Sequence, residues 1–424
     1  MITTAARGGR FWKAFGPGLM WAAAAVGVSH LVQSTRAGAM AGFGLAGVIL
    51  IALILKYPFF EYGPRYAAAT GLSLVEGYSR IGRWALWLYL AITLSTALFV
   101  QLAVVLFTAF VARLAFGLPW SIAVVAALLC AVCATLLAIG HFGVLDWIIK
   151  VVMAVLAVST LIAAGITLPR ADFSSLALLP DLGKGSAVKF AFLLALAGWM
   201  PTAIDLSVWS SLWTLAKDKL EGVRSEMDMV LLDFRIGYIG TGILAFAFLT
   251  LGATVMFGGG ETFSPRGTEF SGQVVDLYTS TLGRWTAPIV LTAIVTTMFS
   301  TSLTVIDGFP RAIDRAFRTA FVDPKGTPGY AGTGRAYWVS LAALAVLTVL
   351  VLEVFPGTLT TMVDFATIVS FLTAPILGYL NLRVVTSEDV PPDLRPGRGL
   401  IALSWVGLTV LTGFALAYLV WRVI

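Results

Sequence analysis

Long apolar segments recur along the whole chain, separated only by short joins rich in proline and glycine. Hydrophobic residues make up 59% of the 424 residues and charged residues 12%, whereas a soluble domain carries about 25% charged residues. A run of about 20 apolar residues is long enough to cross a bilayer as a helix. The sequence therefore predicts an all-α polytopic protein embedded in the lipid bilayer, with no separate soluble domain.

Eleven segments are predicted to span the membrane. They lie at about 14–40, 43–63, 85–112, 119–139, 145–168, 187–215, 236–257, 286–307, 337–355, 359–382 and 399–421. The joins between them are short. The longest on its side, at about 258–284, is expected to be mobile or to hold a short interfacial helix.

Two of these spans are interrupted by residues that an ordinary membrane anchor has no reason to carry. Each polar group without a partner in hydrocarbon costs several kcal/mol, roughly. The first span has a glycine and a polar run at its centre, and the sixth is broken at Gly198–Pro201. Two interrupted spans in corresponding positions of two halves mark the substrate site of secondary transporters. The candidate substrate-binding residues are Gly27, Ser29, His30, Gln33, Ser34, Arg36, Met200, Thr202 and Asp205.

The spacing of the interruptions predicts two repeats of five spans within one transporter domain, residues 1–424. Because five is an odd number, the second repeat starts on the opposite side of the membrane, which makes the repeats inverted. Their predicted bounds are about 14–168 and 187–382, with an added span at about 399–421. With the N-terminus inside, eighteen Lys and Arg residues lie on the inner side and seven on the outer side. This excess predicts a cytoplasmic N-terminus and an outside C-terminus in the cell membrane.

Short motifs in three spans resemble those of a known family. The first span opens with Gly16–Gly18 and continues through Ala37–Ala39 and Gly42–Phe43, the second ends in Pro64–Gly71, and the sixth contains Ala197–Pro201. They are similar to the opening GPG, the ARLGIVTG-like block and the A-x-x-M-P motif of the NRAMP family of proton-coupled divalent-metal transporters. The resemblance implies the LeuT-type inverted-repeat fold and a divalent metal cation as the cargo.

The chain departs from this family where the family binds its metal. The family's first interruption reads DPGN, whose Asp and Asn are metal ligands, and the same positions here are Gly27–His30. In the sixth span the methionine ligand is present as Met200, but the His-Asn that follows it is replaced by Thr202 and Ala203. The resemblance therefore implies metal transport with altered selectivity.

Two classes of substrate remain open. His30, Met200 and Asp205 are the candidate ligands for a softer metal. Arg36 favours instead a small anionic or zwitterionic solute, because a guanidinium forms a two-pronged contact with a carboxylate. Each residue also has a structural interpretation: Arg36 reaching the membrane interface, His30 hydrogen-bonded inside the bundle, and Met200 packed in the core.

Other charged residues within the predicted spans have expected roles as well. Glu61 in the second span and Asp364 in the tenth are the candidates for coupling to a proton or Na⁺. Lys56 is expected to pair with a group on a neighbouring helix. Asp307, which precedes Gly308–Pro310, is expected at a helix end.

Several other functions are disfavoured. The excess of Lys and Arg over Asp and Glu, 28 against 22, is attributed to cytoplasmic loops and not to nucleic-acid binding. No GxxxxGK[ST] motif for ATP and no nucleophile and base pair are present, so neither an enzyme nor a cofactor is expected. Cys130 and Cys133 are interpreted as small buried residues. A channel is the weaker alternative. We predict a secondary-active transporter that works by alternating access.

Overall fold

The computed structural model describes residues 16–139, 142–180, 188–258, 262–323, 326–327, 334–354 and 358–423, of which 142–153 by their backbone alone. The regular structure in this part of the chain is helical throughout. The elements are α2 (Pro17–Ala25), η1 (Ser29–Ser34), α3 (Thr35–Ala41), α4 (Ala46–Thr70), α5 (Leu74–Ile81), α6 (Arg83–Phe116), α7 (Ile122–Ile139), α8 (Phe142–Thr167), η2 (Leu168–Arg170), η3 (Phe173–Ser175), α9 (Phe190–Gly198), α10 (Asp205–Glu221), α11 (Met227–Val255), α12 (Gly267–Leu282), η4 (Arg284–Thr286), α13 (Ala287–Phe321), α14 (Arg335–Val354), α15 (Leu359–Val385) and α16 (Arg398–Val423).

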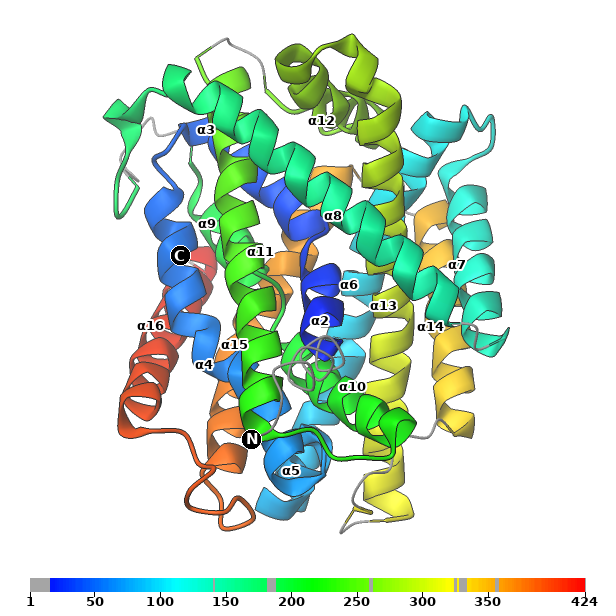
Figure 1. The fold of residues 1–424 in the computed structure, drawn as a ribbon, viewed down its shortest axis with the longest axis vertical. Helices are drawn as coiled ribbons and strands as arrows, with labels where there is room; N and C mark the ends of the chain where they lie inside the picture. Colours follow the sequence, from blue (N-terminus) through cyan, green and yellow to red (C-terminus); the bar gives the residue numbers. More distant parts are fainter. Residues whose placement is uncertain are drawn as a thin grey trace, which may run out of the picture.

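Figure 1 shows the long helices as a bundle, with α8 crossing it obliquely. Helix α12 lies at one end of the bundle and α5 at the other, and we call these the α12 end and the α5 end. Among the described residues, eight helices are long and apolar enough to cross a membrane: α4, α6, α7, α11, α13, α14, α15 and α16. The other three predicted spans coincide with α8 and the two interrupted helices. The count of eleven spans and the bounds of the repeats remain predictions.

Both expected interruptions are present. In the first span, α2 stops at Ala25, Val26 and Gly27 leave the helical conformation, and a π-helical turn over Ser29–Ser34 leads into α3. In the sixth span, α9 ends at Gly198 and α10 begins at Asp205. The intervening segment carries the proline of the motif, which cannot donate the backbone hydrogen bond that a continuous helix needs.

Small residues hold the first interrupted span against α11. A Cβ atom on Gly38 would lie 2.1 Å from the backbone oxygen of Leu249, and one on Gly252 would lie 2.1 Å from the backbone oxygen of Thr35. Without side chains at these positions the two backbones can touch, as at small-residue contacts between membrane helices. Helix α11 is therefore the scaffold that positions α3.

The expectation for Asp307 was wrong, because α13 continues through Pro310 to Phe321. Asp307 lies within the helix and accepts hydrogen bonds from Arg311 at 2.7 and 3.0 Å and from the hydroxyl of Tyr337 at 2.8 Å. These contacts on both sides of Pro310 support the helix where one backbone bond is missing. The loop at about 258–284 does hold a helix, α12, while the short helix α5 was not foreseen.

Candidate transport site

A small cavity lies between the two interruptions. Its walls come from residues within Ala24–Ser29 of the first span, residues within Trp199–Trp209 of the sixth, and the helices α6 and α13. Its volume is about 20 Å³, room for about one water molecule. A larger cargo can therefore enter only if the helices around the cavity move.

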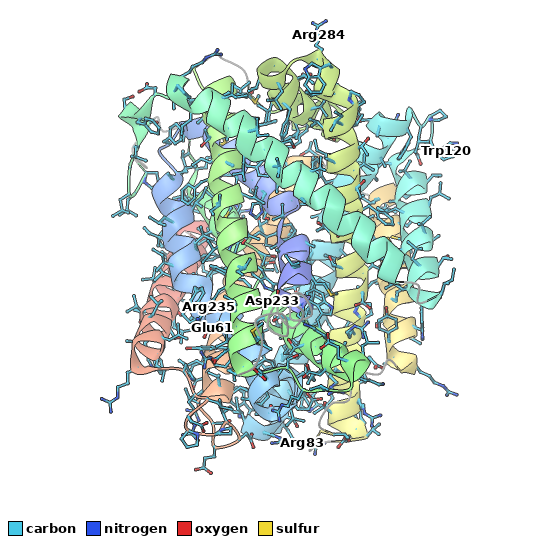
Figure 2. The ribbon with its side chains drawn as sticks, viewed as in Figure 1. Glu61, Arg83, Trp120, Asp233, Arg235 and Arg284 are labelled. Atoms are coloured by element: carbon cyan, nitrogen blue, oxygen red, sulfur yellow. The ribbon has the colours of Figure 1, made fainter. Side chains whose placement is uncertain are left out.

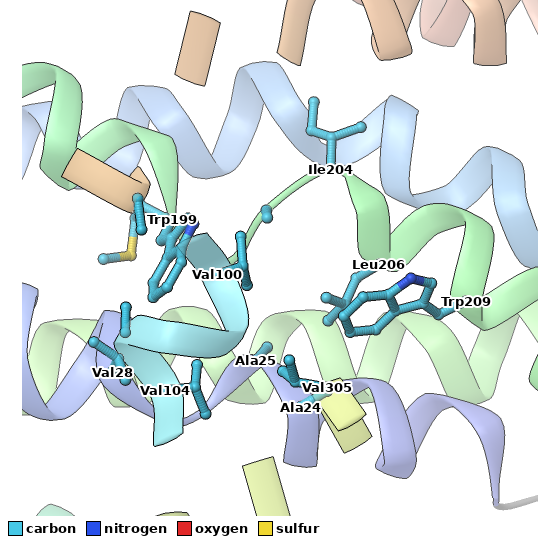
Figure 3. Packing of buried hydrophobic residues seen from close by; sticks show 14 of the residues in the cluster. Ala24, Ala25, Val28, Val100, Val104, Trp199, Ile204, Leu206, Trp209 and Val305 are labelled. Atoms are coloured by element: carbon cyan, nitrogen blue, oxygen red, sulfur yellow. The ribbon is translucent and has the colours of Figure 1, made fainter. Parts of the chain in front are cut away.

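Most of the cavity wall is apolar. Figure 3 shows Trp199 on the same side as Val28, Val100 and Val104, with Leu206 and Trp209 on the other side. The polar side chains in the lining are Ser29, Thr202, Asp205 and Thr301. This composition gives few oxygen atoms to replace the water shell of a metal ion.

Asp205 is the acidic residue of the cavity wall. It is the first residue of α10, where a carboxylate interacts favourably with the helix dipole. Its side chain is 2% exposed; Oδ1 lies 3.5 Å from the hydroxyl of Thr96, and Oδ2 has no hydrogen-bond partner among the described residues. A buried carboxylate oxygen without a partner is costly, so this atom is suited to receive a cation or a hydrogen-bond donor.

Of the three candidate metal ligands, Asp205 alone lines this cavity. The Nε2 atom of His30 lies 2.9 Å from the backbone oxygen of Thr241, to which it must donate, and Nδ1 lies 2.7 Å from the hydroxyl of Ser29. Both ring nitrogens therefore have partners. Met200 is fully buried. The described residues contain no group of three or more His, Cys, Asp or Glu side chains placed to hold a metal. The set of His30, Met200 and Asp205 as metal ligands stays a prediction.

Arg36 forms an ion pair that the sequence did not indicate. Its NH1 and NH2 groups donate to the two carboxylate oxygens of Asp364 at 2.7 and 3.1 Å. Gln33 accepts from Arg36 at 3.0 Å and donates to Asp364, also at 3.0 Å, and the guanidinium lies 4.9 Å from the ring centre of Phe192. The network joins the first span to α9 and α15. An anionic solute would compete with Asp364 for this guanidinium.

Glu61 is tied into a second network of charges, nearer the α5 end. Its carboxylate accepts from Arg65 at 2.6 Å, lies 3.6 Å from Arg235 on α11 and accepts from the hydroxyl of Tyr57. Figure 2 labels Glu61 of α4 and Arg235 of α11 close together. Both coupling candidates, Glu61 and Asp364, thus hold arginines in this conformation, and their coupling roles stay predictions.

The N-terminus of α2 is held by a residue that the sequence analysis missed. Asp233 on α11, labelled in Figure 2, accepts hydrogen bonds from the backbone N–H groups of Gly18 at 2.7 Å and Gly16 at 3.4 Å. A carboxylate at a helix N-terminus satisfies donors that have no partner within the helix. The available signal was an acidic residue just before the predicted seventh span.

The remaining candidates support the interruptions themselves. Gly27 lies against α13, where a Cβ atom would come within 2.8 Å of the Thr301 side chain. Ser34 donates to the backbone oxygen of Ser29 at 3.4 Å, within the π-helical turn. Thr202 lines the cavity.

Comparisons with known proteins agree with this architecture. The family model described as Nramp, natural resistance-associated macrophage protein-like, matches residues 18–421. An uncharacterized protein of Pasteurella multocida, PM0681, is 34% identical over 412 residues, covering 96% of this chain and 92% of its own length.

Three solved structures share the fold at low sequence identity. A mutant of the Eremococcus coleocola manganese transporter is 14% identical with a TM-score of 0.71, covering 96% of this chain and 87% of its own. The nucleobase-cation-symport-1 transporter Mhp1, with bromovinylhydantoin bound, is 13% identical with a TM-score of 0.57, covering 96% of this chain and 92% of its own. MhsT, in complex with L-phenylalanine, is 15% identical with a TM-score of 0.56, covering 95% of this chain and 97% of its own.

A helical bundle with two interrupted spans around a cavity, in the fold that these structures share, defines a multi-pass membrane protein with the LeuT-type fold. The chain belongs to the Nramp family, whose model matches nearly all of it. This is a family of transporters and not of enzymes.

Proposed function

We propose that this protein is a secondary-active transporter that carries a metal cation by alternating access, with Asp205 as the residue that receives the cation. The supporting observation is the buried Oδ2 atom of Asp205, which lacks a hydrogen-bond partner beside the cavity between the two interruptions. The family and the fold shared with a manganese transporter favour a metal as the cargo.

The selectivity proposed for this site differs from the family's usual one. Gly27 and His30 stand where the family has its oxygen ligands, and the cavity wall is mainly apolar. A strongly hydrated divalent ion such as Mn²⁺ needs about six oxygen or nitrogen ligands. We therefore expect slow uptake of Mn²⁺ and a preference for a cation that loses its water more readily.

A panel of cations tests this proposal in proteoliposomes. Uptake of the preferred cation should be saturable and should disappear in Asp205→Asn, which keeps the shape of the side chain and removes its charge. Asp276→Asn, the same change at an exposed position of α12, is the matched control and should transport normally. Rapid, saturable Mn²⁺ uptake that survives both Asp205→Asn and Met200→Ala would refute the assignment of the ligands.

The apolar wall supports one alternative cargo, a small zwitterionic solute whose amino group meets Asp205. Trp199, Trp209 and Phe309 border the same cavity, and aromatic faces attract organic ammonium groups. Competition separates the two proposals. If the cargo is a metal, an excess of small amino acids should leave metal uptake unchanged. If the cargo is an organic solute, the same excess should inhibit uptake of that solute.

Coupling is proposed to use a proton or Na⁺, with Asp364 and Glu61 as the candidate residues. Imposing a pH gradient or a Na⁺ gradient across the same liposomes identifies the driving ion. Uptake that responds to neither gradient would indicate a facilitator or channel, and single-channel current steps would then separate these two.

A further inference from the structure

Lys56 is a fully buried cation whose side-chain hydrogen bonds go to the interruption of the sixth span. It belongs to α4 and has 0% exposure. Its ammonium donates to the backbone oxygens of Ala197 at 3.1 Å, Gly198 at 2.9 Å and Thr202 at 2.8 Å. An ammonium has three N–H donors, so each of them has a carbonyl partner.

These three carbonyls lie where the helix stops, and the Ala197 oxygen also accepts a backbone hydrogen bond from Met200 at 3.4 Å. Ala197 and Gly198 are the last two residues of α9, and Thr202 lies in the non-helical segment before α10. The last carbonyls of a helix form the negative end of its dipole and need an external donor or cation. Asp205 adds an opposite charge that interacts with Lys56, and the ring centre of Phe60 lies 5.7 Å from the ammonium.

A cage of backbone carbonyls at a helix interruption is also the kind of site that binds small monovalent cations in membrane transporters. The Lys56 ammonium carries the same charge as such an ion and uses the same oxygens. We propose that the interruption of the sixth span contains a monovalent-cation site that is permanently filled by the chain's own Lys56.

This assignment has a consequence for the cargo. The carbonyls of Ala197, Gly198 and Thr202 are not available to a transported ion while Lys56 holds them. A cation that binds at Asp205 must then use side-chain oxygens around the cavity and tolerate a positive charge nearby. The inference concerns the stability of the interruption, so it stands or falls independently of the cargo proposed above.

The test is rescue of a Lys56→Ala variant by small cations. The purified full-length protein is melted in choline chloride and, at equal ionic strength, in ammonium, potassium or sodium chloride. Lys56→Ala opens the site and removes its charge, so its Tm should fall in choline. The Tm should then rise to a plateau with increasing concentration of ammonium or another cation that fits the site.

Two further proteins serve as controls. The wild-type protein should show no comparable difference between choline and ammonium. Lys217→Ala changes a lysine on α10 whose ammonium lies 3.9 Å from Glu221, and it should show no cation-specific gain either. If Lys56→Ala does not fold, Lys56→Gln takes its place: it retains two N–H donors and should melt below the wild type in choline and show a small rise in Tm with ammonium.

Three results would overturn the proposal. The first is a Lys56→Ala protein with the wild-type Tm. The second is a destabilised variant whose Tm is the same in ammonium, potassium, sodium and choline. The third is a rise in Tm from choline to ammonium that is equally large in the wild-type protein and the variant. Transport measurements are not part of this test, so a wrong cargo assignment would leave its outcome readable.

Discussion

Gly27 is the position where one added methyl group tests how the first interruption packs against α13. An ideal Cβ atom there would lie 2.8 Å from both Cγ2 and Oγ1 of Thr301 and 3.2 Å from its Cβ. Ordinary contacts begin near 3.4 Å, so α13 or the interrupted segment must shift by several tenths of an ångström. Overpacking of this kind costs about 1–3 kcal/mol, and we expect Gly27→Ala to lower the free energy of unfolding by about 2 kcal/mol.

A second substitution should restore much of this loss. Thr301→Ala removes the two atoms at 2.8 Å and keeps the Cβ atom at 3.2 Å. The double variant should therefore be more stable than Gly27→Ala alone, with a coupling energy of about 1–2 kcal/mol between the two positions. The matched control is Gly413→Ala in α16, where a Cβ atom meets nothing within 4 Å. The control should be neutral or more stable, by up to about 1 kcal/mol, because alanine is the better helix former.

Equilibrium unfolding of the purified protein measures these differences. The protein is titrated from a mild detergent into sodium dodecyl sulfate, and unfolding is followed by tryptophan fluorescence. Either of two results would refute the reasoning. One is a Gly27→Ala protein as stable as the wild type. The other is a double variant whose loss equals the sum of the two single losses, because the 2.8 Å contacts would then have no energetic consequence.

Three further predictions follow from the charged residues and the topology. The half-buried pair of Arg36 and Asp364 should show a coupling energy of about 2 kcal/mol when unfolding is measured for both single alanine variants and the double variant. Arg36→Lys should recover little of the lost stability, since lysine cannot make both contacts. Additive losses of stability would exclude the pair as a stabilising link. Asp233→Asn should loosen α2, seen as faster backbone hydrogen exchange over Pro17–Ala25; unchanged exchange would contradict the role of its carboxylate. In cells, Thr268→Cys should react with a membrane-impermeant maleimide and Arg224→Cys should not; the opposite pattern would reverse the predicted orientation.

The helical class and both interruptions could be predicted because they depend on residues close together in the chain. Apolar length determines whether a segment can cross a bilayer. A polar run containing glycine, or a proline beside glycine, interrupts a helix wherever that helix lies. Asp307 shows the limit of the same reasoning, since Gly308–Pro310 looks like a helix end and lies inside α13. Its ion pair with Arg311 and its bond from Tyr337 support the helix there.

The candidate site could be predicted only in part. Ser29, Thr202 and Asp205 do line one cavity, as the pairing of the two interruptions implied. The partners of the other charged residues could not be read from the sequence, because they lie far away along the chain. Arg36 and Asp364 are 328 positions apart. The sequence therefore predicts separate roles for them, Arg36 as a substrate contact and Asp364 as a coupling residue.

The sequence by itself determined that this chain is a bundle of membrane helices with two polar interruptions, since burial in lipid forces every backbone group to bond within its own segment. Tertiary structure alone decided which polar groups remain for a cargo. Packing α4 against the sixth span brings the Lys56 ammonium onto the carbonyls of Ala197 and Gly198, 141 and 142 positions away. The fold also brings the Arg36 side chain of α3 within 2.7 Å of its carboxylate partner, Asp364 on α15. The Oδ2 atom of Asp205 receives no hydrogen bond from the described residues, and a buried oxygen in that state has the capacity to accept one from a ligand.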